Sequence, residues 1–114
     1  MSDCIFCKIA AGEIPADVVY QDDDVIAFRD LNPQAPTHVL VIPRKHIETL
    51  HHAGQDDAEL MGRLFLGAQR VAEVDGIAGS GYRTVVNCGA GAGQSVFHVH
   101  LHVLGGRALG WPPG

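Results

Sequence analysis

The chain has 114 residues, 46% of them hydrophobic, and a formal net charge of −5. This length fits one globular domain with enough apolar material for a core, and we take residues 1–114 as that domain. The two lysines and six arginines are spread along the chain, so we expect no nucleic-acid polymer as a partner. No apolar run approaches the roughly 20 residues that cross a bilayer. The first residues do not resemble a secretion signal, so we place the protein in the cytoplasm and expect no membrane partner.

Three cysteines, an odd number in a small chain, do not suggest a secreted disulfide framework. Cys4 and Cys7 form a Cys-x-x-Cys pair, which allows a metal knuckle, a redox dithiol or two thiols without a special role. The redox alternative requires a strand before the motif, and only three residues precede Cys4, so we discount it. The metal alternative depends on two more ligands elsewhere in the chain. We expect Cys88 to be a buried small hydrophobic residue.

Short apolar runs separated by turn residues indicate the first strands. Residues 18–20 and 25–28 flank the acidic turn at 21–24 and predict a β-hairpin. Residues 37–43 predict a third strand, which prolines open and close.

One long helix follows, because apolar side chains recur there at three- and four-residue steps. These residues are Leu60, Met61, Leu64, Phe65, Ala68, Val71 and Ala72. Asp56 and Glu59 fit a capping box at the start of the helix, and Gly76 fits its end. We expect this apolar face to belong to the core rather than to a cofactor site.

Two further strands are predicted at residues 82–87 and 96–104, joined by a glycine-rich link over residues 89–95. Strands, one long helix and strands again favour an α+β domain with an antiparallel sheet over the alternating order of an α/β fold. The link fits a flexible hairpin loop or an anion cradle, because glycines let main-chain amides turn toward a phosphate. It leads directly into a row of histidines, and this position favours chemistry at phosphorus.

His98, His100 and His102 alternate with apolar residues near the end of the chain. On a strand, this spacing places the three imidazoles on one face and the apolar residues on the other. Neighbouring groups that titrate near neutral pH repel one another when charged, so a purely structural role is disfavoured. The row predicts either a reaction site or a metal site.

The segment from His98 to Val103, preceded by Gly93-Gln94-Ser95, resembles the histidine-triad motif of the HIT superfamily. Residues 33–38 and 41–43, with the C-terminal Trp-Pro-Pro-Gly, are similar to the Hint branch of nucleotide-binding hydrolases. The resemblance implies a HIT-like fold with an antiparallel sheet of about five strands, one long helix and a short N-terminal helix. It also implies a homodimer whose sheets join across the interface, with residues 105–114 as a tail near the partner's active site.

The activity that the resemblance implies is hydrolysis of the P–N bond of purine nucleoside 5′-phosphoramidates, in which AMP or GMP is joined to an amine. The resemblance assigns His100 as the nucleophile of a covalent nucleotidyl intermediate, which water then hydrolyses. It assigns His102 to charge stabilisation or to protonation of the leaving amine, and His38 to support of the nucleophile. Ser95 joins this catalytic group, and no catalytic metal is expected.

The resemblance also implies a set of nucleotide-binding residues. They are Asp30 at the ribose, Leu31 at the nucleoside, Asn87 near the scissile bond, and Gly93, Gln94 and Ser95 at the phosphate, with His100 and His102. Without the resemblance, Asp30 would be interpreted as a turn-starting aspartate. The choice between adenosine and guanosine would depend on pocket residues such as Ile5, Phe6, Ile9 and Phe28.

In some members of the superfamily, an N-terminal Cys-x-x-Cys, a histidine after the third strand and the first triad histidine bind structural zinc. The matching residues here are Cys4, Cys7, His46 and His98. Two sulfurs and two nitrogens suit tetrahedral zinc and leave no open position for a substrate. Such a site would hold the N-terminus against the sheet.

Three alternatives stay open. Histidines two residues apart on a strand could share a catalytic zinc, with His38 or the third triad histidine completing the site. A nucleotide sensor or scaffold dimer could use the same pocket with little catalysis, and a dinucleoside polyphosphate hydrolase could use the same triad. An enzyme is favoured, because binding gives no reason for three imidazoles beside a phosphate cradle.

Overall fold

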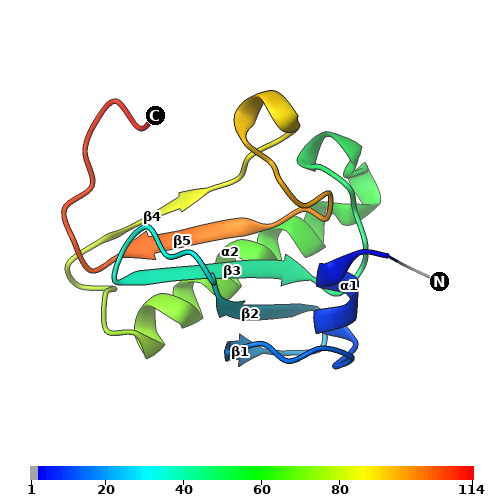
Figure 1. Cartoon of the computed structure of the whole chain (residues 1–114), viewed down its shortest axis with the longest axis horizontal. Helices are drawn as coiled ribbons and strands as arrows, with labels where there is room; N and C mark the ends of the chain where they lie inside the picture. Colours follow the sequence, from blue (N-terminus) through cyan, green and yellow to red (C-terminus); the bar gives the residue numbers. More distant parts are fainter. Residues whose placement is uncertain (1–2) are drawn as a thin grey trace.

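The computed structural model describes residues 3–114, and its centre is a five-stranded antiparallel sheet (Figure 1). The strands are β1 (Val18–Gln21), β2 (Val25–Arg29), β3 (Thr37–Pro43), β4 (Tyr82–Val85) and β5 (Leu101–Gly105), in the order β1-β2-β3-β5-β4. The helices are α1 (Ile5–Ala10) and α2 (Ala58–Val74), and there are 3₁₀ turns η1 (Leu50–His52), η2 (Gln55–Asp57) and η3 (Ala90–Ala92). The predicted α+β class, with one long helix and a short N-terminal helix, is confirmed. Among residues 3–114, no helix combines the length and the apolar character needed to span a membrane.

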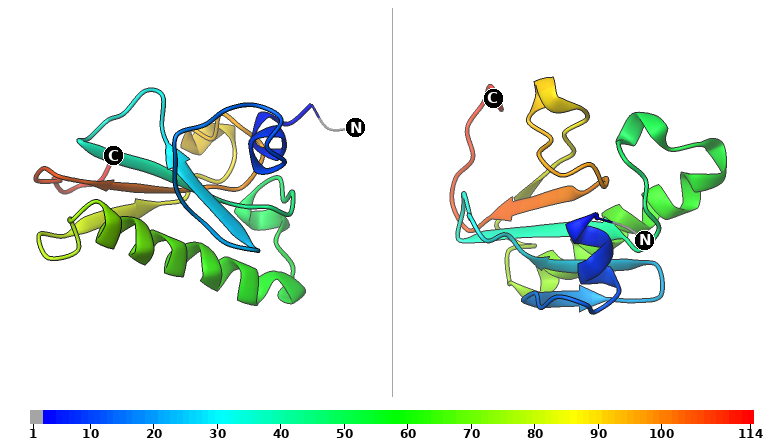
Figure 2. Two further views of the ribbon diagram at one scale, coloured as in Figure 1. Left: turned by 90° about the horizontal axis from the view of Figure 1, so that it is seen from below. Right: turned by 45° about the vertical axis from the view of Figure 1, so that its right-hand side comes forward.

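The two faces of the sheet carry different residues, because side chains alternate along each strand. Helix α2 covers one face and packs on valine, alanine and leucine side chains of β2, β3 and β5 (Figure 2). Helix α1 lies on the opposite face, where Phe6 packs with Ile26, Phe28, Leu40 and Ile42. Histidines of β3 and β5 share this second face, since they alternate with the valines and leucines under α2.

Helix α2 ends where the sequence predicts. Gly76 has a φ of +71°, which side-chain-bearing residues rarely adopt. The Ile77 N–H returns to the Ala72 carbonyl at 3.0 Å, which is the bond of a Schellman end. Ile77 is buried in the core layer beneath the helix, so the turn that ends α2 also closes one end of the core.

The predicted start of α2 is wrong. The helix begins at Ala58, directly after η2, and Asp56 and Glu59 do not form a capping box. The Asp57 side chain instead accepts hydrogen bonds from the Gly54 N–H at 2.9 Å and from the Lys45 ammonium at 2.7 Å. A 3₁₀ turn at the entrance places the reciprocal bonds two residues earlier, between Gly54 and Asp57, and spacing does not reveal such a turn.

The last strand is shorter than predicted. The sequence indicates a strand over residues 96–104, whereas β5 begins at Leu101. The preceding segment is a loop whose main chain bonds to another loop, since the Val99 N–H donates to the Ile47 carbonyl at 2.6 Å. The row of three histidines is therefore only partly on a strand. Strand β4 also ends early, at Val85, and Cys88 is exposed rather than buried.

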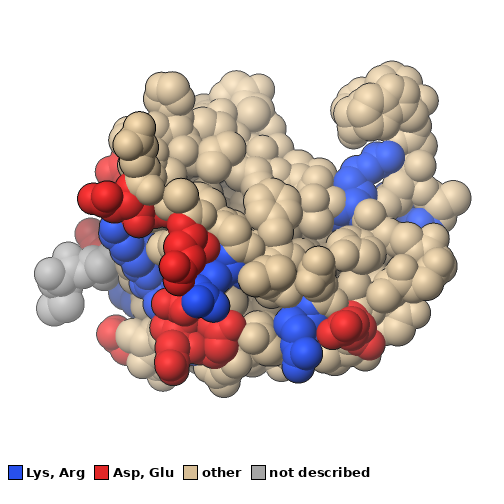
Figure 3. Space-filling view, turned by 180° about the vertical axis from the view of Figure 1, so that it is seen from behind, with Lys and Arg blue, Asp and Glu red and all other residues tan. Residues whose placement is uncertain are grey.

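Seen from the α2 side, charged side chains gather at one end of the molecule in groups of mixed sign (Figure 3). A hollow of about 500 Å³ near this end is lined by residues that include Asp24, Lys45, Asp57, Glu59 and Arg63. Lys45 pairs with Asp57 at 2.7 Å, and Arg63 contacts Asp24 and Glu59 at 3.3 and 3.0 Å. This hollow is larger than those beside the histidines, but Lys45 and Arg63 in its lining are already paired with neighbouring carboxylates.

Replacing Leu64 with alanine should lower the free energy of unfolding by about 2–5 kcal/mol, because Leu64 is 2% exposed between α2 and the sheet. Leu66 lies on the same helix but is 54% exposed, so Leu66→Ala should change that free energy by about 0.5 kcal/mol or less. Urea unfolding of both variants at one protein concentration measures the difference. Equal losses would show that α2 does not pack through the Leu64 face.

Candidate functional site

Four histidines lie near one another on the α1 side of the sheet, and three of them, His38, His100 and His102, line two clefts there. His38 lies on β3, His102 lies on β5, and His98 and His100 lie in the loop that leads into β5. Antiparallel pairing sets His38 opposite Leu104, so His38 and His102 are diagonal neighbours on one face. The Nε2 atom of His38 lies 2.9 Å from Nδ1 of His102, and the rings of His100 and His102 are 5.0 Å apart.

A main-chain carbonyl determines which nitrogen of His100 carries the proton. Nδ1 of His100 lies 2.8 Å from the His98 carbonyl oxygen, and a carbonyl can only accept a hydrogen bond. In neutral His100 the proton is therefore on Nδ1, and Nε2 keeps a lone pair. The side chain is buried, with its ring edge-on to Phe6 at 5.1 Å. His100 has the form that a nucleophilic imidazole requires.

His38 and His102 carry their protons on the other nitrogen. The Gln34 main-chain N–H donates to Nδ1 of His38 at 3.0 Å, so neutral His38 holds its proton on Nε2. The proton on Nε2 of His38 faces two acceptors. Nε2 lies 2.9 Å from Nδ1 of His102 and 3.4 Å from Oδ2 of Asp30. Because Nδ1 of His102 accepts, the proton of His102 is on Nε2. His102 can therefore donate a hydrogen bond from Nε2, but it has no lone pair there.

Burial keeps these two rings uncharged at neutral pH. Burial, and then positive charge on His100 or His38, lowers the pKa of His102 to about 4, against an opposing effect of Asp30. Burial also lowers the pKa of His38, and the Asp30 carboxylate offsets part of that change. His38 and His102 thus act as ordered hydrogen-bonding groups rather than as cations.

Two clefts meet at His102. The first has a volume of about 230 Å³ and is mostly apolar. Its lining includes Ile5, Phe6, Ile9 and Phe28, together with the predicted site residues Asp30, Leu31, Ser95, His100 and His102. The second, of about 270 Å³, is lined by residues that include Gln34, His38, Arg83, Asn87, His102 and Arg107, with Leu109 and Pro113 of the tail. The structure therefore brings most of the predicted set into the first cleft, and places Asn87 and His38 in the second.

The glycine-rich link differs from the predicted anion cradle. Gly89 and Gly93 have φ angles of +89° and +95°, and they flank the 3₁₀ turn η3. The N–H groups of Ala92, Gly93 and Gln94 donate to carbonyls within the link at 3.0–3.2 Å. The freedom of these glycines thus closes a 3₁₀ turn instead of presenting amides to a phosphate.

Gln94 is buried beneath this link. Its side chain accepts from the Gly89 N–H at 2.8 Å and donates to the carbonyls of Glu48 and Val96 at 2.8 and 3.1 Å. Gln94 therefore holds the shape of the link, and the predicted contact between its amide groups and a phosphate does not fit this geometry. Ser95, the next residue, lines the first cleft.

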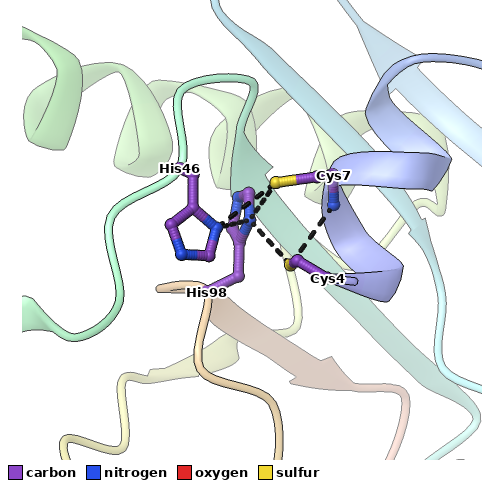
Figure 4. A group of neighbouring side chains, drawn as sticks. All are labelled: Cys4, Cys7, His46 and His98. Atoms are coloured by element: carbon purple, nitrogen blue, oxygen red, sulfur yellow. Dashed lines mark hydrogen bonds between the residues drawn. The ribbon is translucent and has the colours of Figure 1, made fainter. Parts of the chain in front are cut away.

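Cys4, Cys7, His46 and His98 converge from three segments into one cluster (Figure 4). Nε2 of His98 lies 2.8 Å from the Pro43 carbonyl, so the proton is on Nε2 and the lone pair of Nδ1 faces the cluster. Nδ1 of His98 lies 3.4 and 3.5 Å from the sulfurs of Cys4 and Cys7, and 3.2 Å from Nδ1 of His46. All four candidate ligand atoms lie within 4.8 Å of one another. This arrangement is compatible with a metal site.

The predicted alternative of a catalytic metal at the histidine row has a second candidate group, formed by Asp30, His38 and His102. The lone pair of His38 already accepts from the Gln34 N–H, so its Nε2 is protonated and cannot ligate a metal without losing that proton. His98 turns its own lone pair toward the cysteines. The geometry favours a hydrogen-bonded chain over a shared catalytic ion.

Sequence reasoning missed three residues of this region. The Gln34 amide orders His38, and Arg83 and Arg107 line the second cleft. Arg83 could have been found from strand alternation, since it precedes Val85, the partner of His102, by two positions. The sequence carries no signal for the other two, because Gln34 acts through its main chain and Arg107 arrives with the folded tail.

A model of the HIT domain family matches residues 11–109. The chain belongs to the HIT family. A HIT family hydrolase from Legionella pneumophila is 53% identical, with a TM-score of 0.95 over 98% of this chain and 100% of that chain. A histidine triad nucleotide-binding protein from Candida albicans is 32% identical, with a TM-score of 0.82 over 96% of this chain and 83% of that one. The protein HitA of Neisseria gonorrhoeae is 46% identical over 92% of this chain and 97% of its own length.

Acidification should destabilise this HIT-family protein between pH 6.5 and about 4. In that range the unfolded chain protonates His102, whose ordinary pKa is 6.5, whereas the folded chain keeps it neutral down to about 4. The unfolded state then binds more protons, so the free energy of unfolding falls as the pH falls. Urea unfolding at several pH values measures the slope, which His102→Gln should reduce and a change of the exposed His51 to glutamine should not. Equal slopes in wild type and His102→Gln would contradict the low pKa.

Proposed function

We propose that this protein hydrolyses purine nucleoside 5′-phosphoramidates at the P–N bond through a covalent intermediate on His100. The observation that carries the proposal is the 2.8 Å bond between His100 Nδ1 and the His98 carbonyl, because it leaves a nucleophilic lone pair on a residue of the first cleft. Solved relatives support the reaction class, since HIT family proteins from Legionella pneumophila and Clostridium thermocellum are described as hydrolases. The nucleotide-binding protein from Candida albicans supports a nucleotide as ligand.

The first cleft would hold the nucleoside part of the substrate. Ile5, Phe6, Ile9 and Phe28 supply apolar surface for a purine base. Asp30 would accept hydrogen bonds from the ribose hydroxyls, with Leu31 beside the nucleoside. The phosphate would then lie near Ser95, His100 and His102, and the amine would point toward Asn87 in the second cleft.

The reaction would proceed in two displacements at phosphorus. Nε2 of His100 bonds to phosphorus while the P–N bond breaks, and the amine leaves with a proton taken from water. A water molecule then bonds to phosphorus, the bond to His100 breaks, and the proton returns to solvent with release of the nucleoside monophosphate. His102 would donate its Nε2–H to a phosphoryl oxygen and stabilise the charge that develops there. A neutral imidazole holds this proton tightly, so the low pKa of His102 favours that role over protonation of the amine.

The His38 side chain would keep this arrangement in order. It joins the Gln34 amide to Nδ1 of His102 and so sets the nitrogen from which His102 donates. Asp30 faces the same proton of His38 at 3.4 Å. Asp30 would therefore serve both the ribose and the histidine pair.

Hydrolysis of dinucleoside polyphosphates is a second candidate, and one observation favours it. Arg83 and Arg107 line the second cleft, where their guanidinium groups could meet a leaving group that carries phosphates. Rates with diadenosine tetraphosphate and with an AMP phosphoramidate, compared at equal concentration, decide between the two activities.

We also propose that the cysteine–histidine cluster holds one structural zinc ion. Tetrahedral zinc, bound at about 2.3 Å to sulfur and about 2.0 Å to nitrogen, spaces its ligand atoms roughly 3.3 to 3.8 Å apart. Four of the six pairs of ligand atoms lie 3.2 to 3.5 Å apart, which fits this spacing, and all six lie within 4.8 Å. Reduced cysteines are typical of the cytoplasm, so a site built on two thiols supports the proposed cytoplasmic location.

A homodimer is likewise our proposal. Strand β4 is at the edge of the sheet, so its outer main-chain groups are open to a strand from a second copy. Trp111 in the tail is 81% exposed, which is unusual for so large an apolar side chain. Strand β4 and the tail also meet at the second cleft, which is lined by Arg83 and Val85 of β4 and by Leu109 and Pro113 of the tail.

Rapid mixing with an AMP phosphoramidate, followed by acid quench and mass spectrometry, should detect an adenylyl group on His100. The variant His100→Gln should form no adduct and lose turnover by roughly 10³-fold or more, because the nucleophile is absent. It should still bind AMP, since the rest of the first cleft is unchanged. An adduct on another residue, or full turnover by His100→Gln, would rule out the covalent scheme, and a physiological effect that survives in His100→Gln would favour the sensor alternative.

Metal analysis should find about one zinc per chain in the purified protein, as a four-ligand structural site requires. The variant Cys4→Ser should lose the zinc and unfold at a lower temperature. His102→Gln is the matched control and should keep the zinc, because His102 lies outside the cluster. Loss of zinc from His102→Gln would instead support a metal at the histidine row.

A further inference from the structure

The short helix α1 carries two sets of residues with different tasks. Cys4 and Cys7, at its N-terminal end, belong to the metal cluster. Ile5, Phe6 and Ile9 of the same segment line the first cleft. The residues of the two sets are interleaved between positions 4 and 9. Helix α1 therefore cannot shift relative to the cluster without moving one wall of the cleft.

Helix α1 depends on its surroundings for its position. It has six residues, and an isolated helix shorter than about 12 residues is marginal in water. The burial of Phe6 and a 2.9 Å bond from Arg44 to the Ala10 carbonyl hold the middle and the end of the helix. Its N-terminal turn is held by the cluster, since the sulfurs of Cys4 and Cys7 face Nδ1 of His98.

His98 provides a second connection between the cluster and the cleft. The side chain is fully buried, its Nδ1 belongs to the cluster, and its own main-chain carbonyl accepts from Nδ1 of His100. The Phe6 ring contacts both histidines edge-on, at 5.9 Å from His98 and 5.1 Å from His100. A change at the cluster therefore reaches both the apolar wall and the proposed nucleophile.

We propose, building on the proposed nucleotide hydrolysis, that the metal cluster and the nucleotide cleft are thermodynamically coupled, so that zinc at Cys4, Cys7, His46 and His98 increases the affinity for a purine nucleoside monophosphate. The zinc ion would order the N-terminal turn of α1 and the His98 carbonyl before the nucleotide binds, which reduces the ordering that binding itself must supply. Coupling of this kind is reciprocal, so the nucleotide must increase the affinity for zinc by the same factor. The cluster would then act as a positioning element for the reaction site as well as a structural one.

Isothermal titration with AMP, on full-length protein loaded with zinc and on protein freed of zinc by a chelator, tests the coupling. The affinity for AMP should fall at least about fivefold without zinc, the lower end of typical coupling between sites. The affinity for Zn²⁺, measured by competition with a chelator, should rise by the same factor when AMP is present. In protein that remains folded without zinc, this reciprocal shift would not follow from a cluster that only stabilises the fold.

His46→Ala offers a test that leaves α1 and the cleft intact, because His46 belongs to the loop after β3 and reaches the cluster from outside. It should weaken the binding of zinc and, at a fixed low zinc concentration, also that of AMP. Cys88→Ser is the matched control and should change neither, since Cys88 is exposed and outside the cluster. Circular dichroism on each sample confirms that the chain is folded.

Equal AMP affinities with and without zinc in the folded protein would overturn the coupling, and so would a zinc affinity that AMP leaves unchanged. Either result leaves the proposed hydrolysis standing if the zinc-loaded protein still binds AMP and cleaves an AMP phosphoramidate. Absence of AMP binding and of turnover in the zinc-loaded protein would overturn the proposed function and the coupling together.

Discussion

Hydrogen bonds between imidazoles and main-chain atoms decide what each histidine of this protein can do. The Pro43 carbonyl binds the Nε2 proton of His98, and the His98 carbonyl binds the Nδ1 proton of His100. The Gln34 main-chain N–H donates to Nδ1 of His38 instead. Nε2 of His38 therefore carries the proton and donates to Nδ1 of His102. Side chains of one chemical type thus become a candidate metal ligand, a candidate nucleophile and a hydrogen-bond donor. Main-chain groups are suited to this task, because the fold holds them in place at no cost in side-chain entropy.

Burial of these rings ties the electrostatics of the site to the integrity of the fold. A buried polar atom without a partner is strongly destabilising, and within residues 3–114 no buried side-chain nitrogen or oxygen lacks one. The same burial lowers the pKa of His38, His98 and His102, because the charged form is poorly solvated there. The site is therefore ordered as a network of neutral rings, and each tautomer depends on its neighbours being in place.

The alternation of side chains along β2, β3 and β5 separates stability from chemistry. Side chains on one face form a continuous apolar layer under α2, which supplies most of the buried core. The other face carries a smaller apolar cluster around Phe6, and beside it the two clefts and the histidines. Because packing against α2 stabilises the sheet through one face, the other face can carry polar groups and clefts. Helix α1 lies on this second face and contributes to both the cysteine–histidine cluster and the first cleft.

Local pattern determined much of this protein. The helical period of Leu64 to Ala72, Gly76 at the helix end, the strand runs and the spacing of the triad follow from the chain itself, because they depend on neighbouring residues and on side-chain type. The family resemblance also identified the four residues that meet in the cluster. Tertiary structure decided the tautomers, the loop conformation of His98 and His100, the inward turn of the glycine link and the second cleft. Several of these depend on a main-chain atom from a distant segment, such as Gln34, Pro43 or Ile47, and the main chain is the part of a residue that its identity does not reveal.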